Sequence, residues 1–260
     1  MIVEECGDLP VWLRQAYLGS LGEPQELYVE TLVRSGRPLL LHQGEQGQDG
    51  AVTGYAVVSD GVVVEFHLGR DAWSELPAAF GAVLDHSGAG QALCKTFDPL
   101  MLTAAASRPA RTRTVGHLFR SVHGPGQVAG PEITARLAQD SDSDAILAIH
   151  DGFFDDPDEV ERYVTEQALW LYETADFDVL GCGTLTRVIP GQDAVDVGMV
   201  VAPQHRRRGL GAAIVAHLKD RCLQSGDRPI AGCDAENTAS RRALENAGFA
   251  TAHSLIEFTY

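Results

Sequence analysis

A short basic stretch followed by spaced glycines carries the clearest chemistry in this chain: His205-Arg206-Arg207-Arg208-Gly209-Leu210-Gly211. Residues 200–203 before it end an apolar run typical of a strand, and Leu210, Ile214 and Leu218 after it recur at helical spacing. The glycines therefore lie at a helix N-terminus. Free backbone N–H groups and the positive end of the helix dipole favour an anion such as a pyrophosphate there, and glycine permits close approach of a ligand.

The same residues could instead form a solvated basic turn and a tight connection between strand and helix. However, the chain has 36 acidic and 20 basic residues. Against that acidic background, three adjacent arginines beside two spaced glycines favour an anion site.

A second segment, residues 235–249, reads Ala-Glu-Asn-Thr-Ala-Ser-Arg-Arg-Ala-Leu-Glu-Asn-Ala-Gly-Phe. Together with Arg206-x-x-Gly209-x-Gly211 on a strand, loop and helix, it resembles the acyl-CoA-binding region of the GNAT acetyltransferase superfamily. The resemblance covers residues 131–260. It implies an α/β (α+β) domain in which a mixed, mainly antiparallel sheet is flanked by helices and splayed between two strands, with acetyl-CoA in the opening.

The resemblance also implies which residues bind acetyl-CoA. Backbone groups of Met199, Val200 and Val201 would pair with the pantetheine arm like an added strand. Asn237 would contact the arm or cap the helix that follows it, and Ser240 would lie beside the cofactor. The loop and first helical turn would bind the pyrophosphate; these residues are Arg206, Arg207, Arg208, Gly209, Leu210, Gly211 and Ala212.

Acyl transfer to an amine needs a base that removes the proton of the amine. In the GNAT superfamily the base is commonly a carboxylate on the strand before the cofactor loop, and Asp196 fits that place. Alternatively, Asp196 is a solvent-facing strand residue, and Asp234 or Glu236 supplies the carboxylate.

The resemblance does not supply the general acid that would protonate the departing thiolate, because Leu244 stands where many members of the superfamily have a tyrosine. Ser240, Cys233, Tyr172 and Tyr260 are weaker candidates, and water could protonate the departing thiolate. Two other readings stay open for this reason: a non-catalytic acyl-CoA sensor, and an interaction protein with a vestigial cofactor site.

Charge and composition limit the partners. The net charge of −16 repels nucleic acid and anionic lipid and attracts cations. We therefore expect a small-molecule amine, preferably cationic, as the acceptor, and neither nucleic acid nor membrane as a partner.

The five cysteines are scattered without paired spacing, which indicates a reducing, cytoplasmic location. The first residues lack the pattern of an export signal, and no long apolar run predicts a membrane span. No histidine pair has metal-ligand spacing, so we expect no metal.

The 260 residues and 45% hydrophobic content favour two domains. The first half predicts two helices, three strands, a helix, a strand, a helix and a strand. Glycines and prolines in residues 123–131 then predict a linker between domains at 1–122 and 132–260.

The same order begins again after the linker, and the hairpins at 38–58 and 169–185 align. We expect an internal duplication. Where the first half should have a cofactor loop it reads Gly69-Arg70-Asp71-Ala72-Trp73-Ser74-Glu75, without spaced glycines and with acids that repel a pyrophosphate. It resembles a degenerate GNAT repeat, and the chain would be a monomer or a homodimer.

Overall fold

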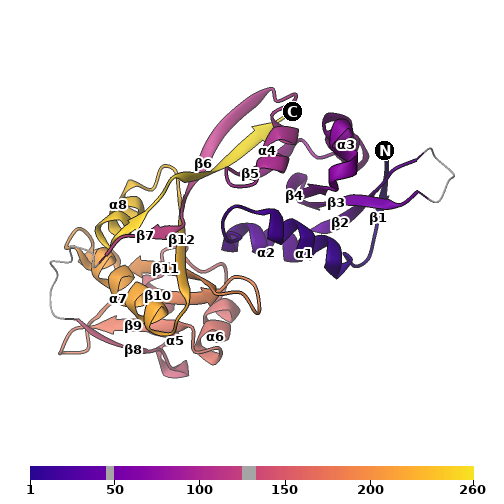
Figure 1. Ribbon diagram of the computed structural model, residues 1–260. Coiled ribbons are helices and arrows are strands. Elements are labelled where there is room, and N and C mark those ends of the chain that lie inside the picture. Colours follow the sequence, from indigo (N-terminus) through magenta and orange to yellow (C-terminus); the bar gives the residue numbers. More distant parts are fainter. Residues whose placement is uncertain (45–49, 125–132) are drawn as a thin grey trace. The chain divides into compact units, whose positions relative to one another are not determined.

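The computed structural model describes residues 1–44, 50–124 and 133–260, and it divides into two compact units (Figure 1). Unit 1 contains Met1–His117 together with His253–Tyr260, and unit 2 contains Leu118–Ala252. These units depart from the domains expected at 1–122 and 132–260, because the last strand of the chain belongs to the first unit. The expected linker at 123–131 lies mostly outside the described residues, and so do residues 45–49 of the hairpin expected at 38–58.

Unit 1 is a mixed sheet with helices on both faces. Its elements are β1 (Ile2–Glu5), α1 (Val11–Ser20), α2 (Leu27–Ser35), β2 (Arg37–His42), β3 (Val52–Ser59), β4 (Val62–Leu68), the 3₁₀ helix η1 (Arg70–Glu75), α3 (Leu76–Ser87), β5 (Gln91–Lys95), α4 (Pro99–Ala105), β6 (Arg111–Phe119, to His117) and β14 (His253–Thr259). The strand order is β1-β2-β3-β4-β5-β14-β6. The periodicity predicted most of these elements, but not β1.

Strand β14 pairs with β5 in antiparallel fashion from Leu255↔Lys95 to Thr259↔Gln91. Phe258 is buried in the core that α3 and α4 cover, and the Tyr260 hydroxyl donates to the Ala105 carbonyl. The final residues of the chain therefore complete the sheet of unit 1.

Unit 2 repeats the same plan. Its elements are β7 (Ser121–Val122), β8 (Thr134–Leu137), η2 (Asp140–Asp142), α5 (Ser143–Ile149), α6 (Pro157–Thr165), β9 (Leu169–Glu173), β10 (Val179–Arg187), β11 (Ala194–Val201), η3 (Pro203–His205), α7 (Leu210–Gln224), β12 (Arg228–Asp234), α8 (Thr238–Asn246) and β13 (Phe249–Ala250). Strands follow the order β8-β9-β10-β11-β12, and β13 pairs with β7.

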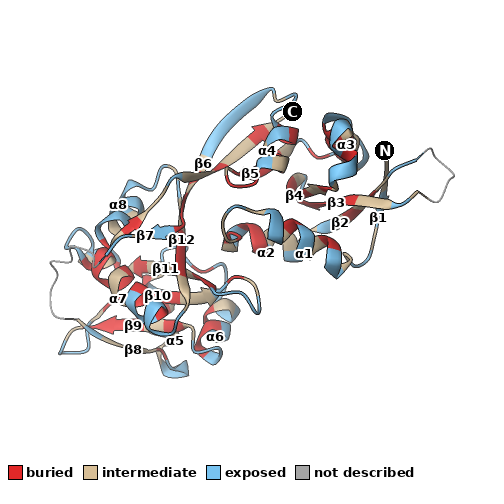
Figure 2. Cartoon of the chain, in the orientation of Figure 1, coloured by how far each residue is buried: buried red, intermediate tan, exposed pale blue. Residues whose placement is uncertain are grey.

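Local sequence fixes several helix starts. Asp98 and Asp156 accept hydrogen bonds from the backbone of Met101 and Glu159, and a proline follows each aspartate at the first helical position. Figure 2 shows buried and exposed residues alternating along the helices. In unit 2, α7 covers one face, and α5 and α6 cover the other.

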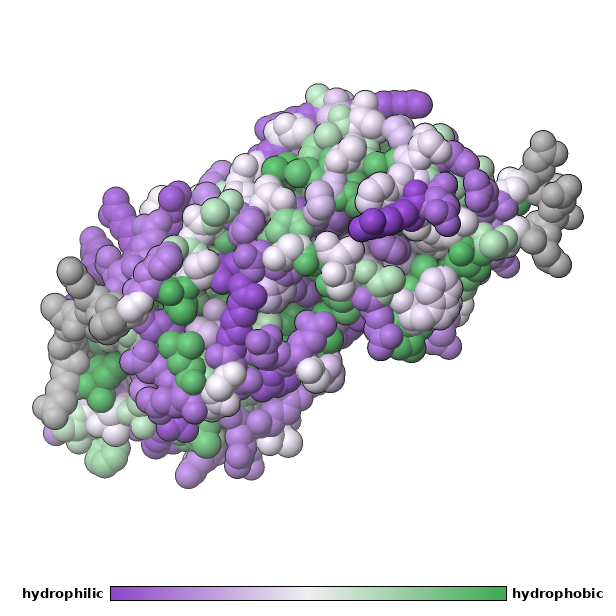
Figure 3. All heavy atoms as spheres, in the orientation of Figure 1, coloured by the Kyte–Doolittle hydropathy of each residue, from purple (hydrophilic) through white to green (hydrophobic). Residues whose placement is uncertain are grey.

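Hydrophilic side chains cover much of the molecular face drawn in Figure 3. Within the described ranges, no helix is both long and apolar enough to span a bilayer.

Candidate active site

Strands β11 and β12 run parallel and then part. They pair from Ala194↔Arg228 to Asp196↔Ile230, and no described pair follows. Met199, Val200 and Val201 lie beyond this point, where they pair only with Gly183, Cys182 and Gly181 of β10. The described pairing of β11 with β12 therefore stops before these residues, and the two strands part as the resemblance implied.

The backbone after β11 turns into α7 through two left-handed residues. Arg207 has φ 63° and Gly209, the residue at the N-cap of α7, has φ 80°. Because Gly209 has no side chain to cap the helix, the N–H groups of the first turn have no partner within it. This is the geometry that suits a phosphate.

Gly211 lies at a crowded contact between α7, α8 and β11. A Cβ built on it would stand 3.3 Å from both the Ala243 Cβ and the Met199 Cε. Leu210 and Ala212 are buried, so their side chains fix the start of α7 in the core. Only their backbone N–H groups are available to a ligand.

The three arginines are not equivalent. Arg206 donates from Nε to the Val201 carbonyl at 3.1 Å and from Nη2 to Asp151 at 2.6 Å. Arg207 and Arg208 are exposed and have no ion pair among the residues that the structure describes. They are the side chains best placed to meet an incoming phosphate.

Asn237 caps α8. Its Oδ1 accepts from the Ser240 N–H at 2.9 Å, which is one of the two roles expected for it. Leu244 is 2% exposed and packs in the α7 core, so a hydroxyl-bearing side chain there would be buried among apolar groups. Two other candidates for the general acid lie elsewhere. The Tyr172 hydroxyl forms a hydrogen bond with His217, and Tyr260 belongs to unit 1.

Asp196 lies at the root of the opening. Strand alternation places it on the α5/α6 face of the sheet, together with Gly198 and Val200. Its direct cross-strand neighbour is Thr186 of β10, and it is half-buried. Asp234, the alternative carboxylate, is exposed and accepts from the Glu236 N–H at 2.7 Å.

In unit 1, β4 and β5 also part, but buried polar side chains link them there. Strands β4 and β5 pair only at Val62↔Gln91 and Val63↔Ala92. Beyond that point the Gln25 side-chain amide bridges a side chain of each strand, donating to Glu65 of β4 at 2.7 Å and accepting from Lys95 of β5 at 2.8 Å. Gln25 is 1% exposed, and Glu65 and Lys95 are fully buried.

Further bonds complete this network. Tyr55 donates to Glu65 at 2.9 Å, Lys95 donates to the Tyr17 hydroxyl at 2.6 Å, and that hydroxyl donates to Asp98 at 2.8 Å. Burial lowers the pKa of Lys95 and raises the pKa of Tyr17. Sequence reading missed this network because its members are isolated polar residues on separate elements.

The strand-to-helix connection of unit 1 also differs from that of unit 2. Gly69 leads directly into η1, and the Trp73 indole donates to the Leu68 carbonyl at 2.9 Å. No spaced glycines open α3, so unit 1 lacks the loop that unit 2 presents.

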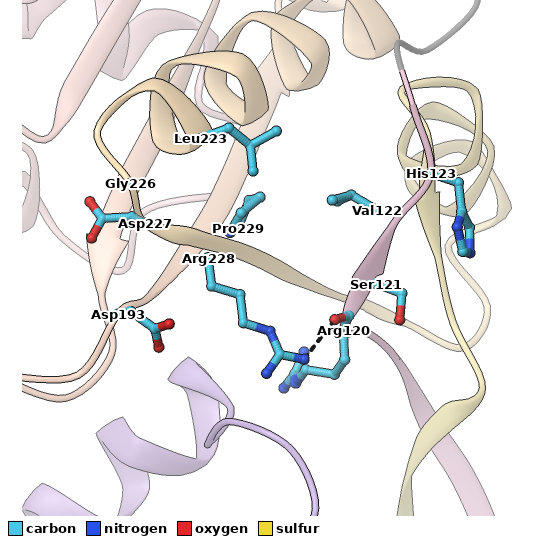
Figure 4. Close-up of a pocket in the computed structure, with 10 residues that line it drawn as sticks. All are labelled: Arg120, Ser121, Val122, His123, Asp193, Leu223, Gly226, Asp227, Arg228 and Pro229. Atoms are coloured by element: carbon cyan, nitrogen blue, oxygen red, sulfur yellow. Dashed lines mark hydrogen bonds between the residues drawn. The ribbon is translucent and has the colours of Figure 1, made fainter.

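A separate hollow of about 460 Å³ lies in unit 2 (Figure 4). It is lined by Arg120, Ser121, Val122, His123, Asp193, Leu223, Gly226, Asp227, Arg228 and Pro229, and Arg228 donates to the Arg120 carbonyl at 3.0 Å. Leu223 and Gly226 lie at the C-terminal end of α7, so this hollow is at the opposite end of that helix from Gly209. No residue expected to bind the cofactor lines it.

Within the described parts of the chain, no three His, Cys, Asp or Glu side chains gather as a metal site would require.

Two models of known families match the chain. A model described as the acetyltransferase (GNAT) family matches residues 135–249, and one described as an acetyltransferase (GNAT) domain matches residues 11–122. The chain belongs to the GNAT superfamily. It is a tandem GNAT protein, as the duplicated pattern predicted, and members of this superfamily typically use acetyl-CoA.

Solved structures show the same fold along the whole tandem chain. An acetyltransferase from the GNAT family of Colwellia psychrerythraea aligns over 100% of both chains with a TM-score of 0.88 and 14% identity. A GCN5-related N-acetyltransferase from Sphaerobacter thermophilus covers 100% of this chain and 95% of its own, with a TM-score of 0.62 and 17% identity.

A tandem GNAT protein from the clavulanic acid biosynthesis pathway covers 100% of this chain and 98% of its own, with a TM-score of 0.61 and 13% identity. At these identities the likeness is one of fold. No curated protein matches the chain.

Proposed function

We propose that this tandem GNAT protein is an N-acetyltransferase that moves an acetyl group from acetyl-CoA directly to a primary amine, at one site in unit 2. The observation that supports this most is the coincidence of two features. The edge of β11 opens beyond Asp196, and the uncapped N-terminus of α7 follows with exposed Arg207 and Arg208.

The residues of unit 2 fit such a donor. The backbone of Met199, Val200 and Val201 would hold the pantetheine arm, and the first turn of α7 with Arg207 and Arg208 would hold the pyrophosphate. Acetyl-CoA supplies an acetyl group activated as a thioester. Asn237 and Ser240 keep α8 in place beside the opening.

We assign Asp196 the role of base. A carboxylate at the root of the opening accepts the proton of the acceptor ammonium, directly or through water, so that the amine becomes nucleophilic. Because residue 244 is a leucine, α8 offers no phenol at that position, and we assign protonation of the leaving sulfur to water.

The acceptor in this proposal is a small, preferably cationic amine. Support comes from the net charge of −16 and from residues 151–161, which include six carboxylates and no lysine or arginine. We also propose a cytoplasmic location, since all five cysteines carry free thiols.

We propose that unit 1 is a degenerate repeat that binds no acetyl-CoA. The network of Gln25, Glu65 and Lys95 bridges β4 and β5 where they part, and in this proposal it excludes a pantetheine arm from unit 1. One equivalent of acetyl-CoA per chain is therefore expected.

A non-catalytic acyl-CoA sensor is the second candidate, and the burial of Leu244 is the observation that favours it. Such a protein would bind acetyl-CoA equally well but would release no coenzyme A with any amine.

Isothermal titration with acetyl-CoA, followed by an amine screen for coenzyme A release, tests both candidates. We expect one equivalent to bind, and the Arg207→Ala/Arg208→Ala variant to bind at least about tenfold more weakly, since each charge-assisted bond to a phosphate contributes about 1.5–3 kcal/mol before solvent screening. Arg221→Ala, an exposed arginine at the other end of α7, is the matched control. Absence of binding by the wild-type protein would sink the proposal, and binding without turnover would favour the sensor.

A further inference from the structure

The connection between α5 and α6, residues 150–156, reaches back to the cofactor loop. We call this segment the α5–α6 loop. Its Asp151 forms the ion pair of 2.6 Å with Arg206, 55 residues later in the chain. The guanidinium that the superfamily signature aims at a phosphate is thus bound to a carboxylate of the same unit.

The backbone conformation of the α5–α6 loop places Asp151 at its tip. Asp151 has φ 48° and Gly152 has φ 75°, so two successive left-handed residues turn the tip of the loop. The Phe153 N–H donates to the His150 carbonyl at 2.8 Å, and Phe154 is 3% exposed. Phe154 anchors the far side of the loop in the core, while Asp151 and Phe153 project from its tip.

Phe153 rests on β11 at Gly198. A Cβ built on Gly198 would stand 2.9 Å from the Phe153 Cζ and 2.5 Å from the Thr184 Oγ1, so glycine is needed for this contact. Gly198 lies two residues after Asp196 on the same face of the strand. The loop tip therefore contacts the cofactor loop through Asp151 and the strand beside the assigned base through Phe153.

Arg206 donates hydrogen bonds to two groups at once. Besides Asp151, it binds the Val201 carbonyl through Nε, and Val201 is on the part of β11 that we assign to the pantetheine arm. A guanidinium binds a phosphate best through two parallel N–H donors. Asp151 and the Val201 carbonyl take the Nη2 and Nε donors of Arg206, so a phosphate that approaches this edge of the guanidinium competes with Asp151.

Resting on the proposed function, we infer that Asp151 is an internal competitor for the donor: it holds Arg206 when the site is empty, and the donor phosphate displaces it. The displacement frees the tip of the α5–α6 loop from the cofactor loop. Donor binding is thereby coupled to a change beside Asp196, where the acceptor amine must enter.

A thermodynamic cycle on acetyl-CoA affinity tests this inference. We expect Asp151→Asn to bind acetyl-CoA about 2- to 5-fold more tightly than wild type, because exposed ion pairs are worth that much and the side chains of Asp151 and Arg206 are 58% and 43% exposed. Asparagine is the suitable replacement, since it tolerates a positive φ. In the Arg206→Ala background, Asp151→Asn should change the affinity no further.

Asp155→Asn is the matched control. It removes the same charge from the same loop, and within the described residues its carboxylate forms no ion pair. An affinity gain equal in Asp151→Asn and Asp155→Asn would reduce the effect to general charge and overturn the inference. So would an equal gain from Asp151→Asn with and without Arg206.

Hydrogen exchange supplies a readout that does not depend on turnover. We expect acetyl-CoA to speed exchange of the Phe153 amide, whose partner is His150, while it slows exchange at the start of α7. Unchanged or slower exchange at Phe153 would overturn the release of the loop. If wild-type protein bound no acetyl-CoA, the proposed function would fail first, so the two failures are distinguishable.

Discussion

The side-chain amide of Gln25 donates a hydrogen bond of 2.7 Å to the carboxylate of Glu65, and both residues are buried. The same amide accepts from Lys95 at 2.8 Å. One neutral side chain therefore joins a buried anion on β4 to a buried cation on β5, across the place where the two strands part.

Removing that amide should destabilise unit 1. Gln25→Leu would leave Glu65 and Lys95 each short of a partner in an apolar setting, at a cost of about 2–4 kcal/mol. Denaturant unfolding measures it. Gln15→Leu, at an exposed position of α1, should change stability by less than about 0.5 kcal/mol. Equal effects of the two variants would contradict the role given to Gln25.

His67 should make stability depend on pH. Burial lowers its pKa below the ordinary 6.5, and its Nδ1 has no hydrogen-bond partner in the described structure. The unfolded chain therefore takes up the proton first as pH falls, so the stability contributed by neutral His67 is present above 6.5 and lost below it.

We expect the denaturation midpoint of wild type to fall between about pH 7 and about pH 5 more than that of His67→Phe. The aromatic replacement keeps the packing beside Tyr17 and Tyr55, whose ring centroids lie 6.2 and 6.1 Å away. If the midpoints of the two proteins changed in parallel with pH, the pKa of His67 would not differ between the folded and unfolded states.

Phe258 tests the place of the last strand. Its side chain is 4% exposed in the core of unit 1, so Phe258→Ala should cost about 3–5 kcal/mol and strip amide-exchange protection from β5. Phe177→Ala, at an 80% exposed position of unit 2, should be nearly neutral. Loss of protection confined to unit 2 would argue against the pairing of β14 with β5.

Asp196 carries the proposed proton transfer. Asp196→Asn should lower kcat/KM by about 10²- to 10⁴-fold while acetyl-CoA affinity stays unchanged, and the acidic limb of the pH–rate profile should disappear. Asp193→Asn, an exposed residue before β11, should keep both rate and profile. Full activity of Asp196→Asn with an unchanged profile would remove it as the base.

Patterns of residues a few positions apart predicted the helices and the helix cap of the candidate site. Helical spacing after Gly209 and the Asn237 cap were readable because each depends on residues a few positions apart. The opening between β11 and β12 came from resemblance to the superfamily, and the structure has it.

Distant pairings were not readable. Strand β14 follows unit 2 in the sequence, and nothing in its alternation indicates that it pairs with β5 of unit 1. Likewise, Arg206 was expected to face a phosphate, and its partner Asp151 stands in a segment with no periodic pattern. Charged side chains can satisfy one another across the fold, so their partners depend on the finished tertiary structure.

The pairing of β14 with β5 also sets a timetable for biosynthesis. Ribosomes add about 5–20 residues per second, so roughly 7–30 s separate the synthesis of His117 from that of the last residues. During that interval the sheet of unit 1 lacks the strand that will lie between β5 and β6. All residues of unit 2 are synthesised before that strand. Although the chain is made from its N-terminus, its N-terminal unit can be the last to finish folding.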